Sequence, residues 1–264
     1  MSERFNISEK DRAILDRIIA PAAPQEKRGQ IINEGFRFIA LGESGSGKTS
    51  LMRAVVYYTL EKGYARFALI HDTKGVFPEY PKSQMCATVA EFRGFDDIPI
   101  VSFRGDPRRD VVCEAEDVAF LSKRYAQKGV TSGGVWTTNP HVLVIEELSA
   151  ASSAGRKQVQ APSVLWAAEQ GRKVSVSLVG TTQSPRKTPL DLLGQATSIA
   201  CFRLTGADSN YLGERLDWPP RFIQAVKGPD GEGVPNKDFA LLVKGEAWDG
   251  EIHRLDKATA LMFE

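Results

Sequence analysis

A glycine-rich segment between an apolar run and a helical pattern constrains this chain more than any other feature. Residues 42–49 read GESGSGKT and match the pattern G-x-x-x-x-G-K-[ST] at every fixed position. The apolar residues 36–41 predict a buried strand, and residues 49–60 predict a helix. Glycines let successive backbone N–H groups turn toward an anion, and a helix N-terminus adds further free N–H groups. The order of strand, loop and helix therefore predicts a phosphate-binding loop.

The side chains of this loop indicate which phosphate compound it holds. Lys48 can reach the β- and γ-phosphates of a nucleotide, and the Thr49 hydroxyl can ligate Mg²⁺. ATP and Mg²⁺ are therefore the expected cofactors. The expected nucleotide-binding residues are Gly42, Glu43, Ser44, Gly45, Ser46, Gly47, Lys48, Thr49 and Ser50.

Apolar, β-branched runs alternate with helical patterns along the rest of the chain. This alternation predicts an α/β fold with a mainly parallel sheet, buried on both faces by helices. With the phosphate loop, it indicates a P-loop NTPase domain that ends in a C-terminal β-hairpin. The further strands are expected at 65–71, 98–103, 142–145, 174–180 and 198–204, and the further helices at 112–127 and 164–170.

Polar or glycine residues lie just after four of the expected strands. These residues are Gly42, Asp72, Glu146 and Gln183. Phosphate sites in such sheets lie at the carboxyl ends of the strands. Together, these four positions favour a single site at the carboxyl ends of the strands more strongly than any one motif does.

Two acids follow the strand in the segment HVLVIEELSA, which is a Walker B pattern. Glu146 would lie beside the Mg²⁺ that Thr49 ligates, and Glu147 would orient or deprotonate the attacking water. The alternative is a strand that ends in a solvated acidic turn. The first acid of this pattern is usually Asp, and the longer Glu146 can contact the metal through water.

A third polar segment, GTTQSPRKTP, follows the strand at 174–180. Its position allows Gln183 to touch both the γ-phosphate and the water, and Thr181 and Thr182 are weaker candidates. Ser184 and Pro185 leave a plain turn as the alternative.

The first thirty residues differ in pattern from the rest. Residues 7–20 predict an amphipathic helix, and residues 21–30, PAAPQEKRGQ, indicate a linker. We therefore expect an N-terminal helix and linker at 1–30 and a P-loop ATPase domain at 31–264. The 264 residues, 42% hydrophobic, suit one large α/β domain with small additions.

Charge and hydropathy limit the possible partners and locations. The formal net charge is only +1, so contact with nucleic acid or membrane would need a local basic patch. The N-terminus has no apolar signal core, and no apolar run approaches about eighteen residues. We expect a soluble protein with neither a signal peptide nor a transmembrane segment.

Several segments occur together in a recognisable order. They are the loop at 42–49, LIHDTKG at 69–75, VLVIEE at 142–147, EQGRKVSVSLVGTTQSP at 169–185 and LLGQATSIACFRLTG at 192–206. In this order they resemble the FtsK–HerA superfamily of DNA-pumping ATPases. The most similar branch is the small genome-packaging ATPases of tailless, membrane-containing double-stranded DNA viruses. The resemblance covers about residues 36–206.

The resemblance implies a RecA-like P-loop NTPase fold of the ASCE type, and it implies further roles. The family works as a ring, usually a hexamer, with ATP between subunits and an arginine that reaches the neighbour's γ-phosphate. Arg172 matches that arginine, with Arg186 and Arg203 as alternatives, and Gln183 matches the polar sensor. Asp72 and Lys74 match a D-x-K-G turn with a structural or coupling role.

A ring would let DNA pass through its centre, where mobile basic loops can hold phosphates weakly and release them. Two segments fit, and ordinary surface loops are the alternative for both. AASSAGRKQVQ carries Arg156 and Lys157. SKRYAQKGVTSGG carries Lys123, Arg124 and Lys128, together with Tyr125.

The expected function is therefore an ATP-driven double-stranded DNA translocase that fills a viral capsid. A capsid-vertex or viral membrane protein would be its docking partner, in host cytoplasm or on the virion. One alternative is another FtsK–HerA motor for DNA processing or secretion. Another is a P-loop small-molecule kinase, although only the weak segment 215–222 resembles an arginine-rich lid. A degenerate nucleotide-binding scaffold conflicts with the presence of Lys48, Thr49 and Glu147.

Overall fold

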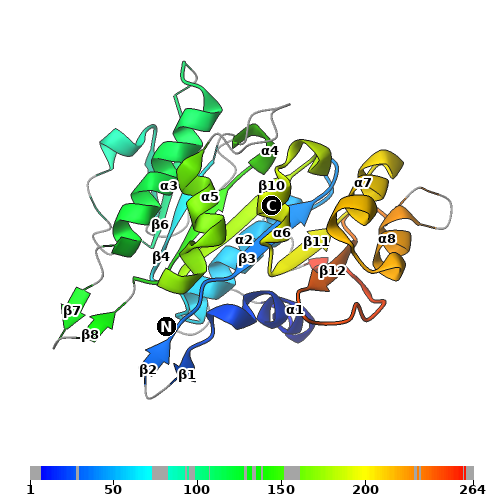
Figure 1. Cartoon of the computed structure of the whole chain (residues 1–264), viewed down its shortest axis with the longest axis horizontal. Coiled ribbons are helices and arrows are strands. Elements are labelled where there is room, and N and C mark those ends of the chain that lie inside the picture. Colours follow the sequence, from blue (N-terminus) through cyan, green and yellow to red (C-terminus); the bar gives the residue numbers. More distant parts are fainter. Residues whose placement is uncertain are drawn as a thin grey trace.

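The architecture is seen in a computed structural model (Figure 1). It describes residues 7–27, 30–72, 83–92, 94, 99–106, 108–127, 130–132, 135–137, 139–151, 161–228, 231, 233–257 and 259. Among these residues, no helix has both the length and the apolar character needed to cross a membrane.

A nine-stranded sheet forms the centre of the molecule, in the order β13-β12-β11-β3-β10-β9-β4-β6-β5. Its pairs from β11 to β5 are parallel, and β12 joins β11 antiparallel as the first strand of the C-terminal hairpin. The expected α/β class with a mainly parallel sheet is confirmed. The strands are β3 (Arg37–Leu41), β4 (Phe67–His71), β5 (Ser83–Cys86), β6 (Ile100–Phe103), β9 (His141–Ile145), β10 (Val176–Thr182), β11 (Ser198–Cys201), β12 (Phe239–Val243) and β13 (Ile252–His253).

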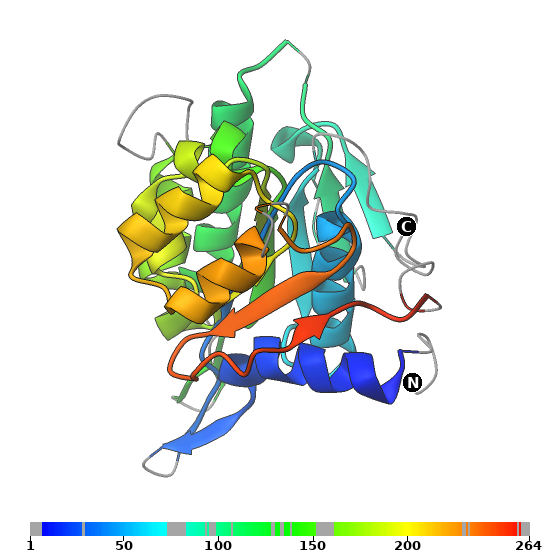
Figure 2. The same ribbon diagram turned by 90° about the vertical axis from the view of Figure 1, so that its right-hand side faces the viewer.

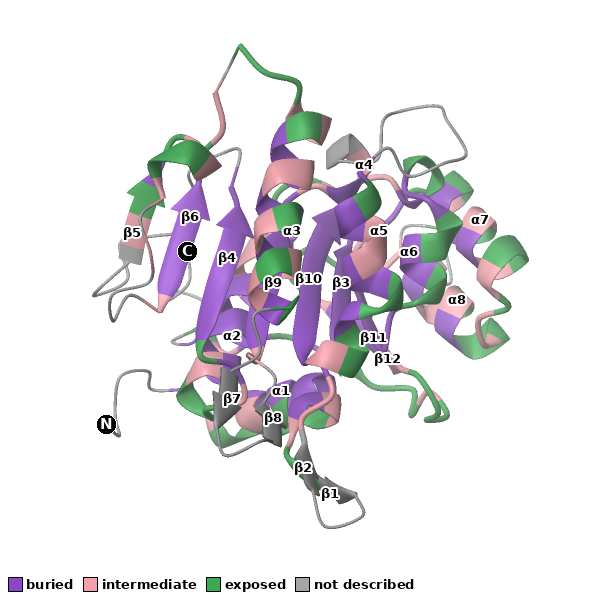
Figure 3. Ribbon diagram, turned by 60° about the vertical axis from the view of Figure 1, so that its left-hand side comes forward, coloured by how far each residue is buried: buried purple, intermediate pink, exposed green. Residues whose placement is uncertain are grey.

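Helices cover both faces of this sheet (Figure 1). Successive residues of a strand point to opposite faces, so Phe38 and Ala40 of β3 pack on one side and Ile39 and Leu41 on the other. Figure 3 shows the central strands buried between the layers. Helices α1 (Glu9–Ile19) and α2 (Lys48–Glu61) cover the first face. The second face carries α3 (Val111–Gln127), α5 (Pro162–Glu169), α6 (Leu190–Gly194), α7 (Gly206–Leu216) and α8 (Pro220–Lys227).

The N-terminal helix forms as its apolar stripe predicts. Ser8 caps α1 by accepting a hydrogen bond from the Asp11 N–H, at 3.1 Å. Leu15 and Ile18 are fully buried in the core that α1 shares with α2. The division of the chain at residue 30 remains a prediction.

Two segments expected as linker or loop contain short antiparallel hairpins instead. β1 (Gln25–Lys27) pairs with β2 (Gln30–Ile32), and β7 (Val130–Ser132) pairs with β8 (Val135–Thr137). Both lie at the end of the sheet where the parallel strands begin (Figure 1). Strands of three residues are too short to show a period of two, so the sequence pattern missed them.

Candidate functional site

The four expected strand ends lie at one edge of the sheet. Ile145 of β9 pairs with His71 of β4 and with Gly180 of β10, and Thr182 of β10 pairs with Leu41 of β3. The residues that follow these strands are those predicted from the sequence, namely Gly42, Asp72, Glu146 and Gln183. The parallel register therefore places the phosphate loop and three polar side chains along the same carboxyl edge.

The phosphate loop joins β3 to α2 through three glycines in left-handed or related backbone conformations. Gly42, Gly45 and Gly47 have φ values of 149°, 74° and 97°. A side chain at Gly42 would start 2.6 Å from the Phe202 Cβ, so both φ and space require glycine there. The Gly42 N–H donates to the Thr182 carbonyl at 3.2 Å, and the Glu43 N–H donates to the Arg203 carbonyl at 3.0 Å. The ends of β10 and β11 thus hold the start of the loop.

Lys48 and Ser46 lie inside this loop. Lys48 is the first residue of α2, is only 8% exposed, and its Nζ donates to the Glu43 carbonyl at 2.6 Å. The ammonium group is therefore kept within the turn, where an incoming phosphate can take over its hydrogen bond. The Ser46 hydroxyl is 1% exposed and has no hydrogen-bond partner among the described residues. A buried polar atom without a partner is costly, so this hydroxyl fits a site that a polar ligand completes.

Glu147 links the end of β9 to the tip of β10. Its backbone has φ of 61°, which is rare for a residue with a long side chain. Its Oε1 accepts hydrogen bonds from the Thr182 hydroxyl at 3.2 Å and the Gln183 N–H at 3.3 Å. Ser149 Oγ donates to the same oxygen, and the Thr181 hydroxyl accepts from the Glu147 N–H at 3.3 Å. The carboxylate is thus fixed by several donors while the residue stays partly open to solvent.

Glu146 and Asp72 are two buried acids at the ends of adjacent strands. They are 1% and 0% exposed, and Asp72 accepts a hydrogen bond from the Ser102 hydroxyl at 3.2 Å. Arg53 of α2 is the buried cation near both. Burial lowers the pKa of Arg53, whereas the nearby Tyr57, Asp72 and Glu146 raise it. Sequence reasoning missed Arg53, although its position four residues after Thr49 places it on the same side of α2.

The oxygen donors at this edge suit Mg²⁺. Thr49 lies in the first turn of α2 and offers a hydroxyl, and Glu146 follows β9 and offers a carboxylate. Hard cations prefer such ligands, and Mg²⁺ is commonly held by one or two protein groups together with substrate phosphates. The donor set therefore fits the predicted metal.

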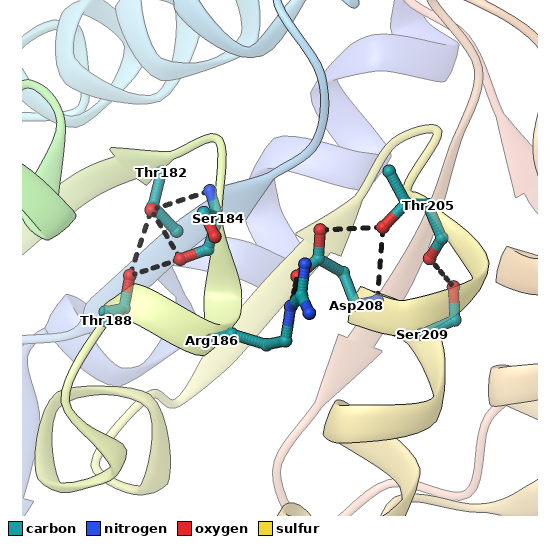
Figure 4. Close-up of polar contacts among 7 residues, drawn as sticks. All are labelled: Thr182, Ser184, Arg186, Thr188, Thr205, Asp208 and Ser209. Atoms are coloured by element: carbon teal, nitrogen blue, oxygen red, sulfur yellow. Dashed lines mark hydrogen bonds and ion pairs between the residues drawn. The ribbon is translucent and has the colours of Figure 1, made fainter. Parts of the chain in front are cut away.

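The polar segment after β10 forms a compact turn (Figure 4). The Thr182 hydroxyl accepts from the Ser184 N–H at 3.3 Å and from the Thr188 hydroxyl at 2.9 Å. Gln183 lies between Thr182 and Ser184 with an exposed side chain. The structure thus combines the predicted alternatives: the segment is a turn, and it presents Gln183 beside Glu147.

The three candidate arginines occupy different places. Arg172 lies before β10, at the end of the sheet where the parallel strands begin, opposite the phosphate loop. Its Nε is 3.2 Å from Glu34 Oε2. Arg186 lies after β10 and donates to Asp208 at 2.8 Å (Figure 4). Arg203 follows β11, and its Nε is 3.7 Å from Glu43 Oε2. Arg172 is thus remote from its own loop, whereas Arg203 lies next to it.

The basic segments expected to face DNA are described only in part. Lys123 and Arg124 belong to helix α3, which corresponds to the helix expected at 112–127, so the expectation that they lie on a mobile loop is wrong. The neighbouring Tyr125 holds this end of the helix to the core, where its ring contacts Phe67 edge-on. Lys123 lies over the Trp166 ring at 5.4 Å, and Arg124 is exposed. The remaining basic candidates, Lys128, Arg156 and Lys157, lie outside the described residues. Lys74 lies outside them as well.

Comparisons with known proteins agree on the fold. No family model and no curated protein matches the chain. Among solved structures, it is similar to the genome-packaging NTPase B204 of Sulfolobus turreted icosahedral virus 2 in complex with AMPPCP. The TM-score is 0.60 at 17% identity, over 85% of this chain and 99% of that chain. B204 of Sulfolobus turreted icosahedral virus gives 0.60 at 18% identity, over 85% and 100% of the two chains.

A secretion protein shares the same architecture. The cytoplasmic domain of the type VII secretion ATPase EccC from Thermomonospora curvata has a TM-score of 0.52 at 11% identity. The match covers 83% of this chain and 24% of that chain. At these identities the likeness shows the fold, which is that of RecA-like P-loop ATPases, and it confirms the sequence resemblance at that level.

Proposed function

We propose that this chain hydrolyses ATP and uses the energy to move double-stranded DNA. The observation that carries the ATPase part is the position of Glu147. Its carboxylate is hydrogen-bonded to the tip of β10, at the same sheet edge as the glycine loop and Lys48. A fixed carboxylate near a phosphate cradle is the arrangement needed to orient a water for attack on a γ-phosphate.

The residues of the site have distinct proposed roles. Lys48 exchanges its bond with the Glu43 carbonyl for the β- and γ-phosphates, and the loop N–H groups hold the same chain of phosphates. Glu147 accepts a proton from the water or orients it, and Gln183 contacts the water or the γ-phosphate as a sensor. Thr49 and Glu146 would hold Mg²⁺, which supplies charge neutralisation on the phosphate oxygens when bound.

We further propose that the protein assembles as a ring, as a hexamer, with Arg172 acting on the nucleotide of a neighbouring subunit. Arg172 lies at the sheet edge opposite its own phosphate loop, so a role in its own site would need a large displacement. A guanidinium acting from a neighbouring subunit is worth about 10³ to 10⁵ in rate. Glu34 would hold this side chain until the neighbour's nucleotide replaces it.

Packaging of a viral genome is the proposed task of this motor. The sequence resemblance and the shared fold with the viral B204 NTPase support this choice. A capsid-vertex or viral membrane protein would recruit the motor, in host cytoplasm or on the virion. Arg156, Lys157 and Lys128, with Lys123 and Arg124 at the end of α3, remain the proposed DNA contacts.

Steady-state ATP hydrolysis tests these roles. The purified chain is assayed with Mg²⁺, with and without long double-stranded DNA, at low and moderate salt. We expect several-fold stimulation by DNA that weakens with salt, because phosphate contacts release counterions. Lys48→Ala should abolish hydrolysis, and Lys10→Ala, which changes an exposed lysine of α1, should leave it unchanged.

Other outcomes would redirect the proposal. Hydrolysis that is indifferent to DNA would retain the ATPase and overturn the translocase. A secretion motor, which the shared fold with EccC favours, would then be tested by stimulation with polypeptide. Phosphate transfer to a small molecule in place of water would instead indicate a kinase.

A further inference from the structure

A turn near the C-terminus lies against the phosphate loop, although it belongs to a part of the chain outside the sequence resemblance. Strand β12 is antiparallel to β11, with Ala240 opposite Cys201, which in turn pairs with Leu41 of β3. The start of β12 therefore lies at the carboxyl edge of the sheet, where the phosphate loop begins. Figure 2 shows β12 in orange, starting beside the blue loop between β3 and α2.

Lys237, two residues before β12, makes the close approach. A side chain at Gly47 would start 3.7 Å from the Lys237 Cα and 3.9 Å from its Cβ. It would also start 3.4 Å from the Phe202 ring, which packs on Phe239 with ring centroids 5.1 Å apart. The lysine backbone is thus fixed against the glycine that precedes Lys48. Its exposed side chain therefore begins next to the residue that precedes α2.

The turn is held in a defined conformation. The Asp238 N–H donates to the Pro235 carbonyl at 3.1 Å, which closes the turn around Lys237. Arg254, one residue after β13, forms an ion pair with Asp238 and donates to the Asn236 carbonyl at 3.4 Å. Lys237 itself has φ of 69°, a conformation that lysine rarely adopts. The C-terminal hairpin therefore keeps Lys237, in this rare backbone conformation, beside the phosphate loop.

We propose that Lys237 is a second cationic contact for the phosphates of the nucleotide that the loop of the same chain holds. This inference rests on the proposed nucleotide binding and adds a residue to it. An ammonium group placed near phosphates forms charge-assisted hydrogen bonds, which are stronger than neutral ones. The contact adds binding energy without placing Lys237 at the reacting water, so it acts on affinity for ATP and ADP alike.

Lys244 provides a matched control at the other end of the same strand. It follows Val243, is exposed, and its N–H donates to the Thr197 carbonyl just before β11. It therefore lies at the sheet edge opposite the phosphate loop. Removing its charge changes the protein's net charge by the same amount as removing that of Lys237, at a place remote from the site.

The test is the dissociation constant of Mg²⁺–AMPPCP and of Mg²⁺–ADP, measured by calorimetry at low and moderate salt. Lys237→Gly keeps the backbone conformation without strain, Lys237→Arg keeps the charge, and Lys244→Gln is the control. We expect Lys237→Gly to weaken both ligands about tenfold at low salt. The difference from wild type should shrink with salt, Lys237→Arg should bind within about threefold, and Lys244→Gln should equal wild type.

Each other outcome has a distinct meaning. If wild type binds and Lys237→Gly binds equally well, the inference is wrong and the proposed ATPase stands. If Lys237→Gly is weak but Lys237→Arg does not recover, the backbone of the turn matters rather than the charge, which also overturns the inference. If wild type binds neither ligand, the proposed function fails and this inference fails with it. Thermal unfolding of Lys237→Gly at or above the wild-type midpoint shows that the variant is folded.

Discussion

At the scale of single residues, Glu147 combines a rare backbone conformation with a carboxylate that hydrogen bonds hold in place. Its φ of 61° is unfavourable for a glutamate, and its carboxylate is held by Thr182, Gln183 and Ser149. Backbone strain of this kind persists only where the surrounding structure enforces it, and it concentrates at functional sites. Glu147 thus differs from Glu146 in backbone conformation as well as in its position in the segment.

Substitution of Glu147 should separate stability from activity. Glu147→Gln should lower kcat by about 10² to 10⁴, because a positioned base is lost, while nucleotide binding persists. Glu147→Gly and Glu147→Ala should be equally inactive, yet Glu147→Gly should be more stable than Glu147→Ala by about 1 kcal/mol, because both lose the carboxylate and only glycine relieves the strain. Hydrolysis assays and urea unfolding measure the two effects. An active Glu147→Gln variant would remove this residue from the mechanism.

Buried histidines should make the fold sensitive to acid. Burial lowers the pKa of both His71 and His141 to about 4, whereas the unfolded value is 6.5. The unfolded chain therefore binds more protons in this range, so stability falls as pH drops from 6.5 to 4. Each histidine would remove about 3 kcal/mol over the full interval. Glu114, 4.0 Å from His71, acts in the opposite direction because burial raises its pKa.

Denaturant unfolding between pH 7 and pH 4.5 measures this dependence. Wild type should lose stability steadily, and His71→Gln should show a shallower loss because one titrating group is gone. His253 contributes in the same direction because burial also lowers its pKa. A stability profile that is flat from pH 7 to pH 4.5 would contradict the neutral buried state of both imidazoles.

At the scale of elements, most strands and helices of the central layers were predicted closely, and the three-residue strands of the two small hairpins were not. The pattern at 142–145 corresponds to β9 (His141–Ile145), and that at 112–127 to α3 (Val111–Gln127). Long elements repeat their apolar period several times, so the pattern is legible in the sequence. The hairpins β1–β2 and β7–β8 offer only three residues per strand, and their pairing depends on contacts the sequence does not display.

Helix α1 should unfold together with the rest of the core. Leu15 is fully buried in the cluster that joins α1, α2 and β3. Leu15→Ala should therefore lower the free energy of unfolding by about 2–5 kcal/mol, because a large cavity replaces the side chain. Lys10→Ala, on the exposed face of α1, should have little effect. Circular dichroism and tryptophan fluorescence should report one transition, and two separate transitions would instead support an independent unit at residues 1–30.

At the scale of the whole molecule, the two edges of the sheet carry different groups. The carboxyl edge holds the glycine loop, Glu147 and Gln183, and the amino edge holds Arg172 with Glu34. If Arg172 takes part in hydrolysis, one chain alone does not form a complete site, because its Arg172 lies far from its own glycine loop. The proposed ring supplies the missing group by bringing one subunit's Arg172 to another subunit's nucleotide.

Mixing of two inactive variants tests this arrangement. Lys48→Ala lacks the lysine that binds phosphate, and Arg172→Ala lacks the arginine proposed to act on a neighbour's nucleotide. Each variant alone should therefore hydrolyse ATP poorly. In mixed assemblies, an intact Arg172 from one subunit can meet an intact Lys48 site in another, and part of the activity should return. Lys173→Ala, which changes the exposed neighbour of Arg172, should remain active. A mixture no more active than its components would place the arginine in its own site or outside the mechanism.

The sequence by itself predicted the glycine loop, the acids at 146 and 147 and the parallel sheet, because these depend on local spacing and on apolar periods within one segment. It also predicted that Gly42, Asp72, Glu146 and Gln183 would meet, since parallel strands share a carboxyl edge. Only the tertiary structure decided that Glu147 is hydrogen-bonded to the tip of β10, that Arg53 lies near Glu146 and that Lys237 approaches Gly47. Those contacts join residues far apart in the chain, and strand order and register, rather than local pattern, bring them together.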